Sequence, residues 1–452
     1  MPAKKSASAK KTSRSLRYAI VGTGGRSTMF LKAITETYKS RSTLVALCDS
    51  NPLRAANWAA EIPGKKPPIY GPEDFLPMVK KHRVDTVVVT SMDRTHHRYI
   101  VAALRAGCDV ITEKPMTTDA EKCREILQAQ KETGRSVRVT FNYRYSPRNS
   151  RVKEVLQSGL IGQVLSVHFE WLLDTKHGAD YFRRWHRDKR NSGGLLVHKS
   201  THHFDLVNWW LDTLPTEVCA FGGLRFYGRE NQEQHGFGGR YPYATGHPNA
   251  KGDPFALDLT SSESLRKFYL EPAAVDGYRR DQNVFGDGIS IEDDLGLLVR
   301  YRSQAIMTYH LTAYSPWEGY RVMFNGTRGR LELDVTETSY VSADDQDHNF
   351  AVNVQGASEF VMEEPARLLF RPHWGKPQNL PIAVQSGGGH GGGDKLLLSD
   401  LFEGAKADPL RRGADHRDGA WSILTGIAGN RSLAENRIVS VAEFGLGDYL
   451  GS

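Results

Sequence analysis

The chain has 452 residues, of which 39% are hydrophobic and 25% are charged, and its formal net charge is +7. This length and composition predict a globular protein with two domains and exclude one small core. No stretch has the roughly 18 consecutive apolar residues that a membrane helix needs. The four cysteines show neither metal-binding nor disulfide spacing, which indicates reduced thiols in a cytoplasmic protein. Part of the positive charge lies in residues 1–15, which we expect to form a disordered basic leader, and we expect no membrane or nucleic-acid partner.

A glycine turn follows the first predicted strand. Residues 18–21 form an apolar run, Gly22-Thr23-Gly24-Gly25-Arg26-Ser27 follows it, and residues 28–38 suit a helix. A second apolar run at 44–47 closes on Asp49. The order strand, glycine turn, helix, strand and acid predicts a Rossmann unit that holds a nicotinamide dinucleotide, because the glycines let the backbone approach the pyrophosphate at a helix N-terminus.

The acid after the second strand indicates which dinucleotide binds. Asp49 lies where a carboxylate accepts hydrogen bonds from the hydroxyls of the adenosine ribose, and it would repel the 2′-phosphate of NADP. NAD is therefore the expected cofactor. NADP stays an alternative, because Arg26 or Arg54 could pair with that phosphate.

The first domain continues to residue 141 with the same alternation of helices and strands. We expect helices at 73–82, 97–106 and 118–133 and strands at 85–90, 109–112 and 137–141. Open parallel sheets bind ligands at the carboxyl ends of their strands, so the side chains that follow these strands should face the cofactor. The residues expected to bind the cofactor are Gly22, Gly24, Gly25, Arg26, Ser27, Asp49, Thr90, Ser91, His96, Glu113 and Lys114.

Residues 142–452 show one helical segment and then a run of strands, which predicts an α+β domain with an open, mainly antiparallel sheet. We expect a helix at 152–158 and strands at 163–171, 218–224, 291–301, 306–313, 321–325 and 329–335. Residues 225–288 are rich in glycine, proline, asparagine and arginine and predict a long insertion over the sheet or the mouth of the site. Two further helices, at 395–404 and 418–436, are expected to pack back on the Rossmann domain at 16–141. The fold class is thus α/β.

Short motifs mark both domains. They are Gly22-Thr-Gly-Gly25, Cys48-Asp49, Asp93-Arg-Thr-His96, Glu113-Lys-Pro115, Asn142-Tyr-Arg144, Gly159-Leu-Ile-Gly162, Gly193-Gly194, His202-His203-Phe-Asp205 and Trp209-Trp-Leu211. Together they resemble the family of glucose–fructose oxidoreductase, inositol dehydrogenase and MocA. The resemblance implies a second domain that binds substrate and whose open sheet mediates a homo-oligomer, either a dimer or a tetramer. It also implies hydride transfer between a secondary alcohol of a sugar, glycoside or cyclitol and the nicotinamide, with Lys114 and His202 as catalytic residues.

The chain departs from the family pattern at His198, where the family has an aspartate four residues before the catalytic histidine. Helical spacing of four predicts that His198 and His202 share one helix face. Three interpretations stay open. His202 is the base and His198 assists in catalysis as a substrate ligand or proton relay; or the pair binds a divalent metal with His186, His390 or Asp394; or neither histidine is catalytic. We adopt the first interpretation, which needs no metal.

Two further segments carry residues suited to a sugar. Residues 180–186 mix aromatic rings with polar groups, which bind sugar rings and hydroxyls, and residues 387–394 place glycines on both sides of a histidine. The residues expected to bind substrate are Asn142, Arg144, Tyr181, Trp185, His186, His198 and His390.

The glycine-rich segment also resembles part of the NAD-dependent α-N-acetylgalactosaminidases, a hydrolase branch of the same superfamily. Those enzymes oxidise a sugar hydroxyl transiently, eliminate the glycoside and add water back, without net redox change. A glycoside hydrolase or lyase that recycles NAD is therefore the alternative function. A third possibility is a catalytically silent binding protein, which the presence of both Lys114 and His202 disfavours.

Overall fold

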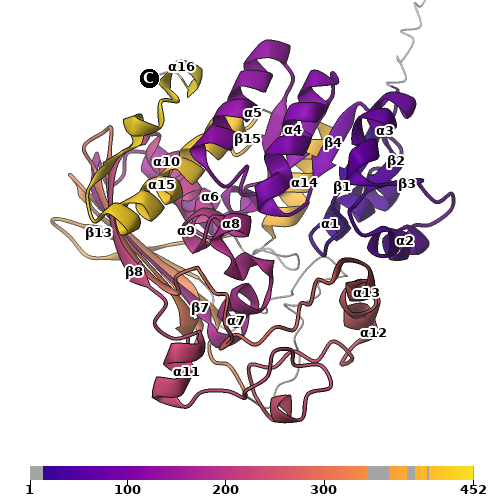
Figure 1. The fold of residues 1–452 in the computed structure, drawn as a ribbon. Helices are drawn as coiled ribbons and strands as arrows, with labels where there is room; N and C mark the ends of the chain where they lie inside the picture. The colour runs from indigo at the N-terminus through magenta and orange to yellow at the C-terminus, as the bar shows by residue number, and fades with distance from the viewer. Residues whose placement is uncertain (1–13, 344–365, 384–391, 405–406, 451–452) are drawn as a thin grey trace, which may run out of the picture.

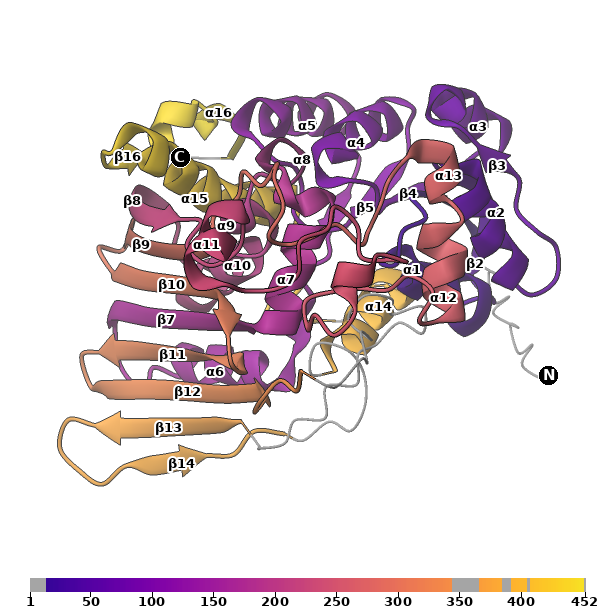
Figure 2. The same cartoon turned by 60° about the horizontal axis from the view of Figure 1, so that its bottom comes forward.

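The computed structural model describes residues 14–343, 366–383, 392–404 and 407–450, and two sheets organise them (Figures 1 and 2). The first sheet has seven strands, and only the edge strand β15 runs antiparallel to its neighbour. In spatial order the strands are β15 (Ala414–Asp415), β6 (Val137–Val139), β5 (Asp109–Thr112), β4 (Thr86–Val89), β1 (Leu16–Val21), β2 (Ser42–Cys48) and β3 (Ile69–Tyr70).

Helices cover both faces of this Rossmann sheet, which explains why all four residues of β4 are buried. They are α1 (Ser27–Lys32) with a π-helical continuation (Ala33–Thr37), α2 (Pro52–Glu61), α3 (Phe75–Lys81), α4 (His96–Arg105) and α5 (Ala120–Thr133). Every strand predicted for this domain is present. The sequence analysis missed β3 and β15, because strands of two residues are too short to show an alternating pattern. It also missed α2, which begins with Asn51 as N-cap and Pro52 in the first turn.

The second sheet has nine strands, and the predicted antiparallel character is confirmed except between β7 and β10, which are parallel. In spatial order the strands are β14 (Gln378–Leu380), β13 (Arg367–Pro372), β12 (Gly329–Thr338), β11 (Glu318–Gly326), β7 (Val164–Asp174), β10 (Ile306–Ser315), β9 (Asp294–Tyr301), β8 (Pro215–Gly223) and β16 (Val439–Ser440). Along β10 and β12 buried residues alternate with more exposed ones, so one face of the sheet is covered.

Helices lie against that covered face and fill the space toward the Rossmann domain (Figure 2). They are α6 (Pro147–Gln157), α7 (Thr175–Arg183), α8 (Lys189–Ser192), α9 (Leu195–His198), α10 (Thr201–Leu211) and α15 (His416–Glu435). Two further short helices are a 3-10 helix (Asn142–Tyr145) and α16 (Gly447–Leu450). No helix in the described part of the chain combines the length and apolar character that a bilayer crossing requires.

Aromatic stacking joins the helices to the second sheet. Trp171 of β7 is fully buried, with its ring 4.1 Å from that of His203 on α10 and 4.6 Å from that of Tyr320 on β11. His203 Nδ1 lies 2.7 Å from the Tyr309 hydroxyl. This histidine next to His202 therefore belongs to the core of the domain.

The insertion at residues 225–288 has two parts. Its first part packs at the end of the sheet, with Phe226 stacked 4.9 Å from Tyr314 of β10. It contains α11 (Arg229–His235), and the second part contains α12 (Glu263–Leu265) and α13 (Ala273–Asp276). The second part does not cover the sheet but lies beside α2 of the Rossmann domain (Figures 1 and 2).

Helix α14 (Gly393–Glu403) returns the chain to the Rossmann domain. The ring of Phe402 stacks on Tyr38 at 5.3 Å and lies 5.3 Å from the ring of Tyr18 on β1. At the other side, Asp400 pairs with Arg138 of β6 at 2.5 Å. Since α14 also begins with Gly393 and Asp394, this packing fixes the position of Asp394 at the edge of the Rossmann sheet.

We expect Phe402→Ala to lower the free energy of unfolding by about 3–5 kcal/mol, because a buried ring against two tyrosines leaves a cavity. Urea unfolding followed by circular dichroism measures the change. Lys395→Ala, at an exposed position of the same helix, is the control and should stay within about 0.5 kcal/mol. Equal effects of the two substitutions would contradict the anchoring role of Phe402.

Candidate active site

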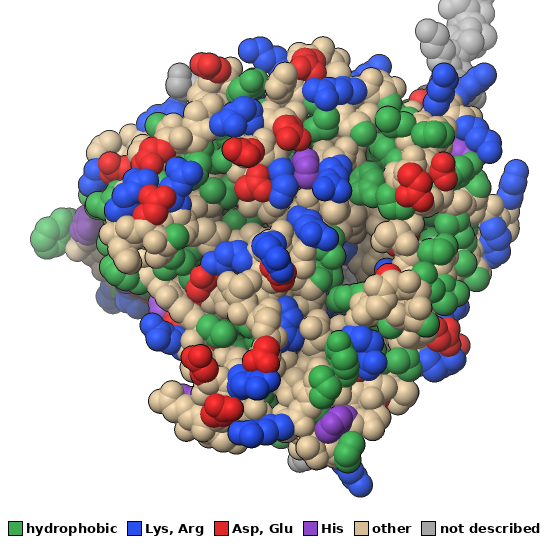
Figure 3. Space-filling view, in the orientation of Figure 1, with side chains coloured by type: hydrophobic (Ala, Val, Ile, Leu, Met, Phe, Trp, Pro, Cys, Tyr) green, Lys and Arg blue, Asp and Glu red, His purple; other side chains and the backbone are tan. Residues whose placement is uncertain are grey.

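The glycine turn brings the ends of β1 and β4 together. Gly22 has φ +87°, and a Cβ atom there would lie 2.5 Å from Ser91 Cα, so only glycine fits. A Cβ atom on Gly24 would meet no heavy atom within 4 Å, so the other side of the turn faces open space. Ser27 Oγ donates to the Gly24 carbonyl at 2.7 Å and holds the shape of the turn. Figure 3 shows a hollow in the surface near α1, between the Rossmann domain and the insertion.

Asp49 follows β2 and bonds to the glycine turn. Its carboxylate accepts hydrogen bonds from Thr23 N at 2.5 Å, from Thr23 Oγ1 at 2.7 Å and from Asn51 N at 2.7 Å. The acid thereby fastens the glycine turn to β2, and its contact with a ribose stays a prediction. Arg54 lies 3.8 Å from Asp49 and pairs with Asp276 of the insertion at 3.0 Å.

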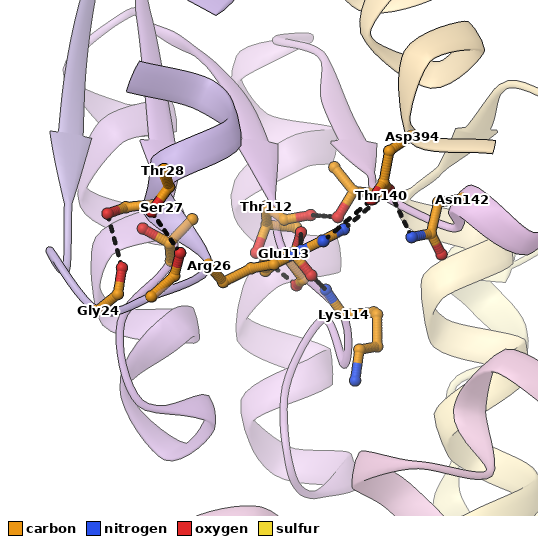
Figure 4. A network of polar contacts seen from close by, with 12 residues as sticks. Gly24, Arg26, Ser27, Thr28, Thr112, Glu113, Lys114, Thr140, Asn142 and Asp394 are labelled. Atoms are coloured by element: carbon orange, nitrogen blue, oxygen red, sulfur yellow. Dashed lines mark hydrogen bonds and ion pairs between the residues drawn. The ribbon is translucent and has the colours of Figure 1, made fainter. Parts of the chain in front are cut away.

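Arg26 stands at the centre of a polar network that joins four segments of the chain (Figure 4). Its Nε donates to Glu113 Oε1 at 2.8 Å, and its Nη2 lies 3.3 Å from Asp394 Oδ1. Asn142 Nδ2 donates to the same Asp394 oxygen at 2.6 Å. The network ties the glycine turn to the end of β5, to the turn after β6 and to α14.

Lys114 follows Glu113, and its amine points away from these carboxylates (Figure 4). The amine donates to the His198 carbonyl at 3.1 Å, which connects the Rossmann sheet to α9. Burial lowers the pKa of Lys114 to about 8, although the carboxylates of Asp93 and Glu113 oppose this shift. A buried lysine with such a pKa can exchange a proton near neutral pH.

His96, Thr90 and Ser91 hold the loops around the site. The two ring nitrogens of His96 lie 2.8 Å from the Pro115 carbonyl and 2.9 Å from the Ser91 carbonyl, which locks the turn that carries Lys114. Thr90 Oγ1 donates to the Gly22 carbonyl at 2.6 Å. These three residues thus shape the predicted cofactor edge, and their contact with a cofactor stays a prediction.

Asp93 and His198 form a buried pair across the domain boundary. A hydrogen bond of 2.5 Å joins His198 Nδ1 to Asp93 Oδ2. Burial lowers the pKa of His198 well below its usual range and raises the pKa of Asp93, so the two groups share one proton as a neutral pair. The sequence analysis did not include Asp93 among the site residues. The available signal was its place in the loop after β4, where a carboxylate faces the carboxyl edge of the sheet.

The prediction that His198 and His202 share one helix face is wrong. His198 ends α9 and His202 lies in the first turn of α10. Ser200 N bonds to the Leu195 carbonyl at 2.8 Å, five residues back, so a wide turn interrupts the helical repeat between them. The ring of His202 lies 4.4 Å from that of Tyr143 and stays in a different environment from that of His198.

The described residues offer no set of ligands for the metal interpretation. Within the described ranges, no group of three His, Cys, Asp or Glu side chains is arranged to hold an ion. Asp394 is bonded in the network of Arg26, and His390 lies outside the described residues.

Three of the predicted substrate residues gather around His198. The ring of His186 lies 4.2 Å from His198, and that of Tyr181 lies 5.5 Å from it. Trp185 stacks on His186 at 3.6 Å. Burial lowers the pKa of His186 well below its usual range, and its Nδ1 makes no hydrogen bond within the described residues. Residues 181–186 thus form an aromatic wall next to the Asp93–His198 pair.

Arg144, predicted to bind substrate, forms ion pairs between helices. Its guanidinium pairs with Asp205 at 2.6 Å and with Asp418 at 3.0 Å, and it is buried between α10 and α15. This ion pair holds two helices together, and contact of Arg144 with a substrate stays a prediction.

The residues at this edge fit a dinucleotide. The open side of Gly24 leaves room for a phosphate against the backbone, and Asp49 stands beside the turn, where the ribose is predicted. Asn142 Oδ1 is buried and accepts no hydrogen bond from any described residue, so it can receive one from a ligand amide. The fold and this edge define a dinucleotide-binding oxidoreductase.

The comparison with family models agrees. Residues 16–141 match the NAD-binding Rossmann fold of the oxidoreductase family, and residues 153–441 match its C-terminal alpha/beta domain. The chain therefore belongs to the oxidoreductase family of glucose–fructose oxidoreductase, inositol dehydrogenase and MocA.

Several relatives match this chain, and the share of the chain that each one covers differs. The protein YteT of Bacillus subtilis (strain 168) is 36% identical over 92% of this chain and 95% of its own length. Inositol 2-dehydrogenase 2 of Saccharopolyspora erythraea is 34% identical over 43% of this chain, and the match spans about half (54%) of that relative. The crystal structure of the WlbA dehydrogenase from Bordetella pertussis, in complex with NADH and UDP-GlcNAcA, has a TM-score of 0.59 at 19% identity and covers 94% of this chain and 99% of its own. At this identity the structural likeness shows the fold.

We expect Asp93→Ala to destabilise the protein by about 1–3 kcal/mol, because it leaves the buried Nδ1 of His198 without a partner. Asp93→Asn is the matched variant and should cost less, since its amide keeps a hydrogen bond. Denaturant unfolding of both variants measures the difference. If alanine and asparagine cost the same, the hydrogen bond to His198 contributes nothing to stability.

Proposed function

We propose that this protein is an NAD(P)-dependent oxidoreductase that transfers a hydride between a secondary alcohol of a sugar, glycoside or cyclitol and the nicotinamide. The observation that carries the proposal is the half-buried amine of Lys114 after β5, which donates to the His198 carbonyl at 3.1 Å. A sheet edge with a glycine turn, a ribose-facing acid and a proton-exchanging lysine supplies what such a reaction needs.

The cofactor would lie along the carboxyl edge of the Rossmann sheet. The glycine turn would hold the pyrophosphate, Asp49 the adenosine ribose and Asn142 the nicotinamide end. When bound, the nicotinamide supplies the hydride acceptor. We favour NAD over NADP, because Arg26 and Arg54 are already paired with Glu113 and Asp276 and neither is free to receive a 2′-phosphate.

Lys114 would manage the proton of the substrate hydroxyl. Its neutral amine accepts that proton at Nζ during oxidation, and the ammonium returns it during reduction. The His198 carbonyl, 3.1 Å from Nζ, keeps the amine directed at the aromatic wall. His202, against Tyr143, stays our candidate for the second base.

The aromatic wall and the names of the relatives support this substrate class. The rings of Tyr181 and Trp185 present apolar faces that suit a sugar or cyclitol ring, and His186 offers a ring nitrogen for a hydroxyl. Several relatives are named inositol 2-dehydrogenase, and the solved aldose-aldose oxidoreductase from Caulobacter crescentus shares the fold with a TM-score of 0.60.

A second candidate function is a glycoside hydrolase or lyase that recycles bound NAD. The Asp93–His198 pair favours it, because it adds a proton-carrying group next to Lys114. A route of oxidation, elimination and hydration needs more than one acid–base group.

The first experiment mixes the protein with NAD and a panel of sugars, cyclitols and aryl-glycosides, and follows both nicotinamide absorbance and aglycone release. Accumulation of NADH with one substrate supports the dehydrogenase. Aglycone release without NADH accumulation supports the second candidate. Absence of both with every substrate would contradict the proposed function.

In the same assay, Lys114→Met should lower kcat by roughly 10²–10⁴-fold, the usual contribution of a general acid–base group, while NAD still binds. Because the neutral amine is the active form, kcat/KM for alcohol oxidation should rise with pH through about 8 in the wild type, and this rise should vanish in the variant. Lys131→Met, at an exposed position on α5, is the control. Unchanged turnover in Lys114→Met would remove Lys114 from the mechanism.

Cofactor choice gives a separate test. We expect the wild type to bind NAD more tightly than NADP, and Asp49→Asn to narrow the ratio of the two dissociation constants by about tenfold, since a charge repulsion near 1.4 kcal/mol is lost. Fluorescence titration measures both constants. Asp74→Asn, at an exposed position before α3, should leave the ratio unchanged. Tighter binding of NADP by the wild type would overturn the preference.

A further inference from the structure

The second part of the insertion, residues 262–280, crosses from the substrate domain to the Rossmann domain. We call this segment the strap. It includes α12 and α13 and lies beside α2, the helix that follows Asp49 (Figures 1 and 2). The strap therefore reaches the end of the sheet where the adenosine half of a dinucleotide is expected.

An aromatic pair anchors the strap. Phe268 stacks on Trp58 of α2 with ring centroids 4.1 Å apart, and both side chains are buried. Phe268 and Leu265 share one hydrophobic cluster with Phe30 of α1. Apolar burial of this kind keeps a segment closed, because opening it exposes the rings to water.

Polar contacts fix the strap at the start of α2. Asn51 Nδ2 donates to the Pro272 carbonyl at 2.8 Å, and Asn57 Nδ2 donates to the Lys267 carbonyl at 2.6 Å. Arg54 Nη2 pairs with Asp276 at 3.0 Å. Since Asn51 and Arg54 are also the neighbours of Asp49, these contacts surround the predicted ribose position.

Tyr269 carries the strap to the glycine turn. A Cβ atom built on Gly25 would lie 3.1 Å from the Tyr269 hydroxyl. The guanidinium of Arg280 lies 4.5 Å from the centre of the Tyr269 ring, and Arg280 pairs with Asp180 of α7 at 3.2 Å. The buried hydroxyl of Tyr278 makes no hydrogen bond with any described residue. The Tyr269 hydroxyl is thus held near the backbone that would cradle a pyrophosphate.

We propose that the strap is the outer wall of the dinucleotide site, with Tyr269 as a pyrophosphate contact, and that it retains the cofactor between turnovers. This inference rests on the proposed function, because it assumes a nicotinamide dinucleotide along the Rossmann edge. The dinucleotide leaves only after the Phe268–Trp58 pair and the contacts of Asn51 and Asn57 separate. Release is then limited by opening of the strap rather than by the strength of the glycine-turn contacts alone.

The test measures cofactor release without turnover. The full chain is loaded with NAD, excess nucleotide is removed by gel filtration, and release is followed after a chase with a fluorescent NAD analogue. We expect Phe268→Ala to release NAD roughly tenfold faster or more, because the aromatic anchor is lost. Tyr269→Phe removes only the hydroxyl and should quicken release by roughly tenfold to hundredfold, the range for one lost hydrogen bond to a charged group.

Arg266→Ala is the matched control. Arg266 lies in the strap but pairs with Glu271 of the same segment at the surface, so its loss should leave release unchanged. Thermal unfolding of each apo variant tests whether the chain still folds. If Phe268→Ala does not fold, Tyr269→Phe still tests the proposal.

The possible outcomes separate the two proposals. Wild-type protein that binds NAD but releases it at the same rate as both strap variants would overturn the strap proposal and leave the proposed function intact. Wild-type protein that binds neither NAD nor NADP at any concentration would overturn the proposed function itself.

Discussion

The ion pairs of Arg26 are the interaction on which the arrangement of the site depends. Two buried carboxylates, Glu113 and Asp394, would repel each other and lose their hydration without the guanidinium between them. Because the three groups come from the glycine turn, the end of β5 and the start of α14, one cation holds together segments far apart in the sequence. Loss of a partner in such a buried network typically costs several kcal/mol, so the geometry around Lys114 is maintained by the same contacts that stabilise the fold.

The chemistry of the site follows from burial. Water would keep Lys114 charged and the Asp93–His198 pair ionised, but the interior disfavours charge on each of them. The result is a lysine that exchanges a proton near neutral pH, close to a buried Asp93–His198 pair in which charge is disfavoured. His198 makes two of these contacts. Its backbone carbonyl accepts a hydrogen bond from the amine of Lys114, and its ring Nδ1 is hydrogen-bonded to the carboxyl group of Asp93. His198 replaces the aspartate of the family pattern, and a carboxyl group is still present at this point because Asp93 of the Rossmann domain bonds to the histidine ring.

The insertion changes how the cofactor edge is enclosed. In an open Rossmann sheet the adenosine end faces solvent, whereas here the strap lies over α2 and its Tyr269 hydroxyl reaches the glycine turn. An enzyme that keeps its NAD must reoxidise it in place, either with a second substrate or within one reaction cycle. Whether the strap retains NAD therefore bears on which of the two candidate functions applies, a dehydrogenase with net oxidation or a redox-neutral glycoside hydrolase.

Local sequence determined most of the strands of both sheets, the glycine turn and Lys114, because alternating burial, tight turns and the carboxyl ends of parallel strands leave patterns within a few residues. It could not determine the pairing of His198 with Asp93, which lies 105 positions away in the other domain. The spacing of four residues between His198 and His202 predicted a shared helix face, and this prediction is wrong because a wide turn at Ser200 separates the two histidines. The strap was recognisable as an insertion, but only tertiary packing placed Phe268 on Trp58. Contacts between distant segments depend on how layers dock, and that information is spread over the whole chain.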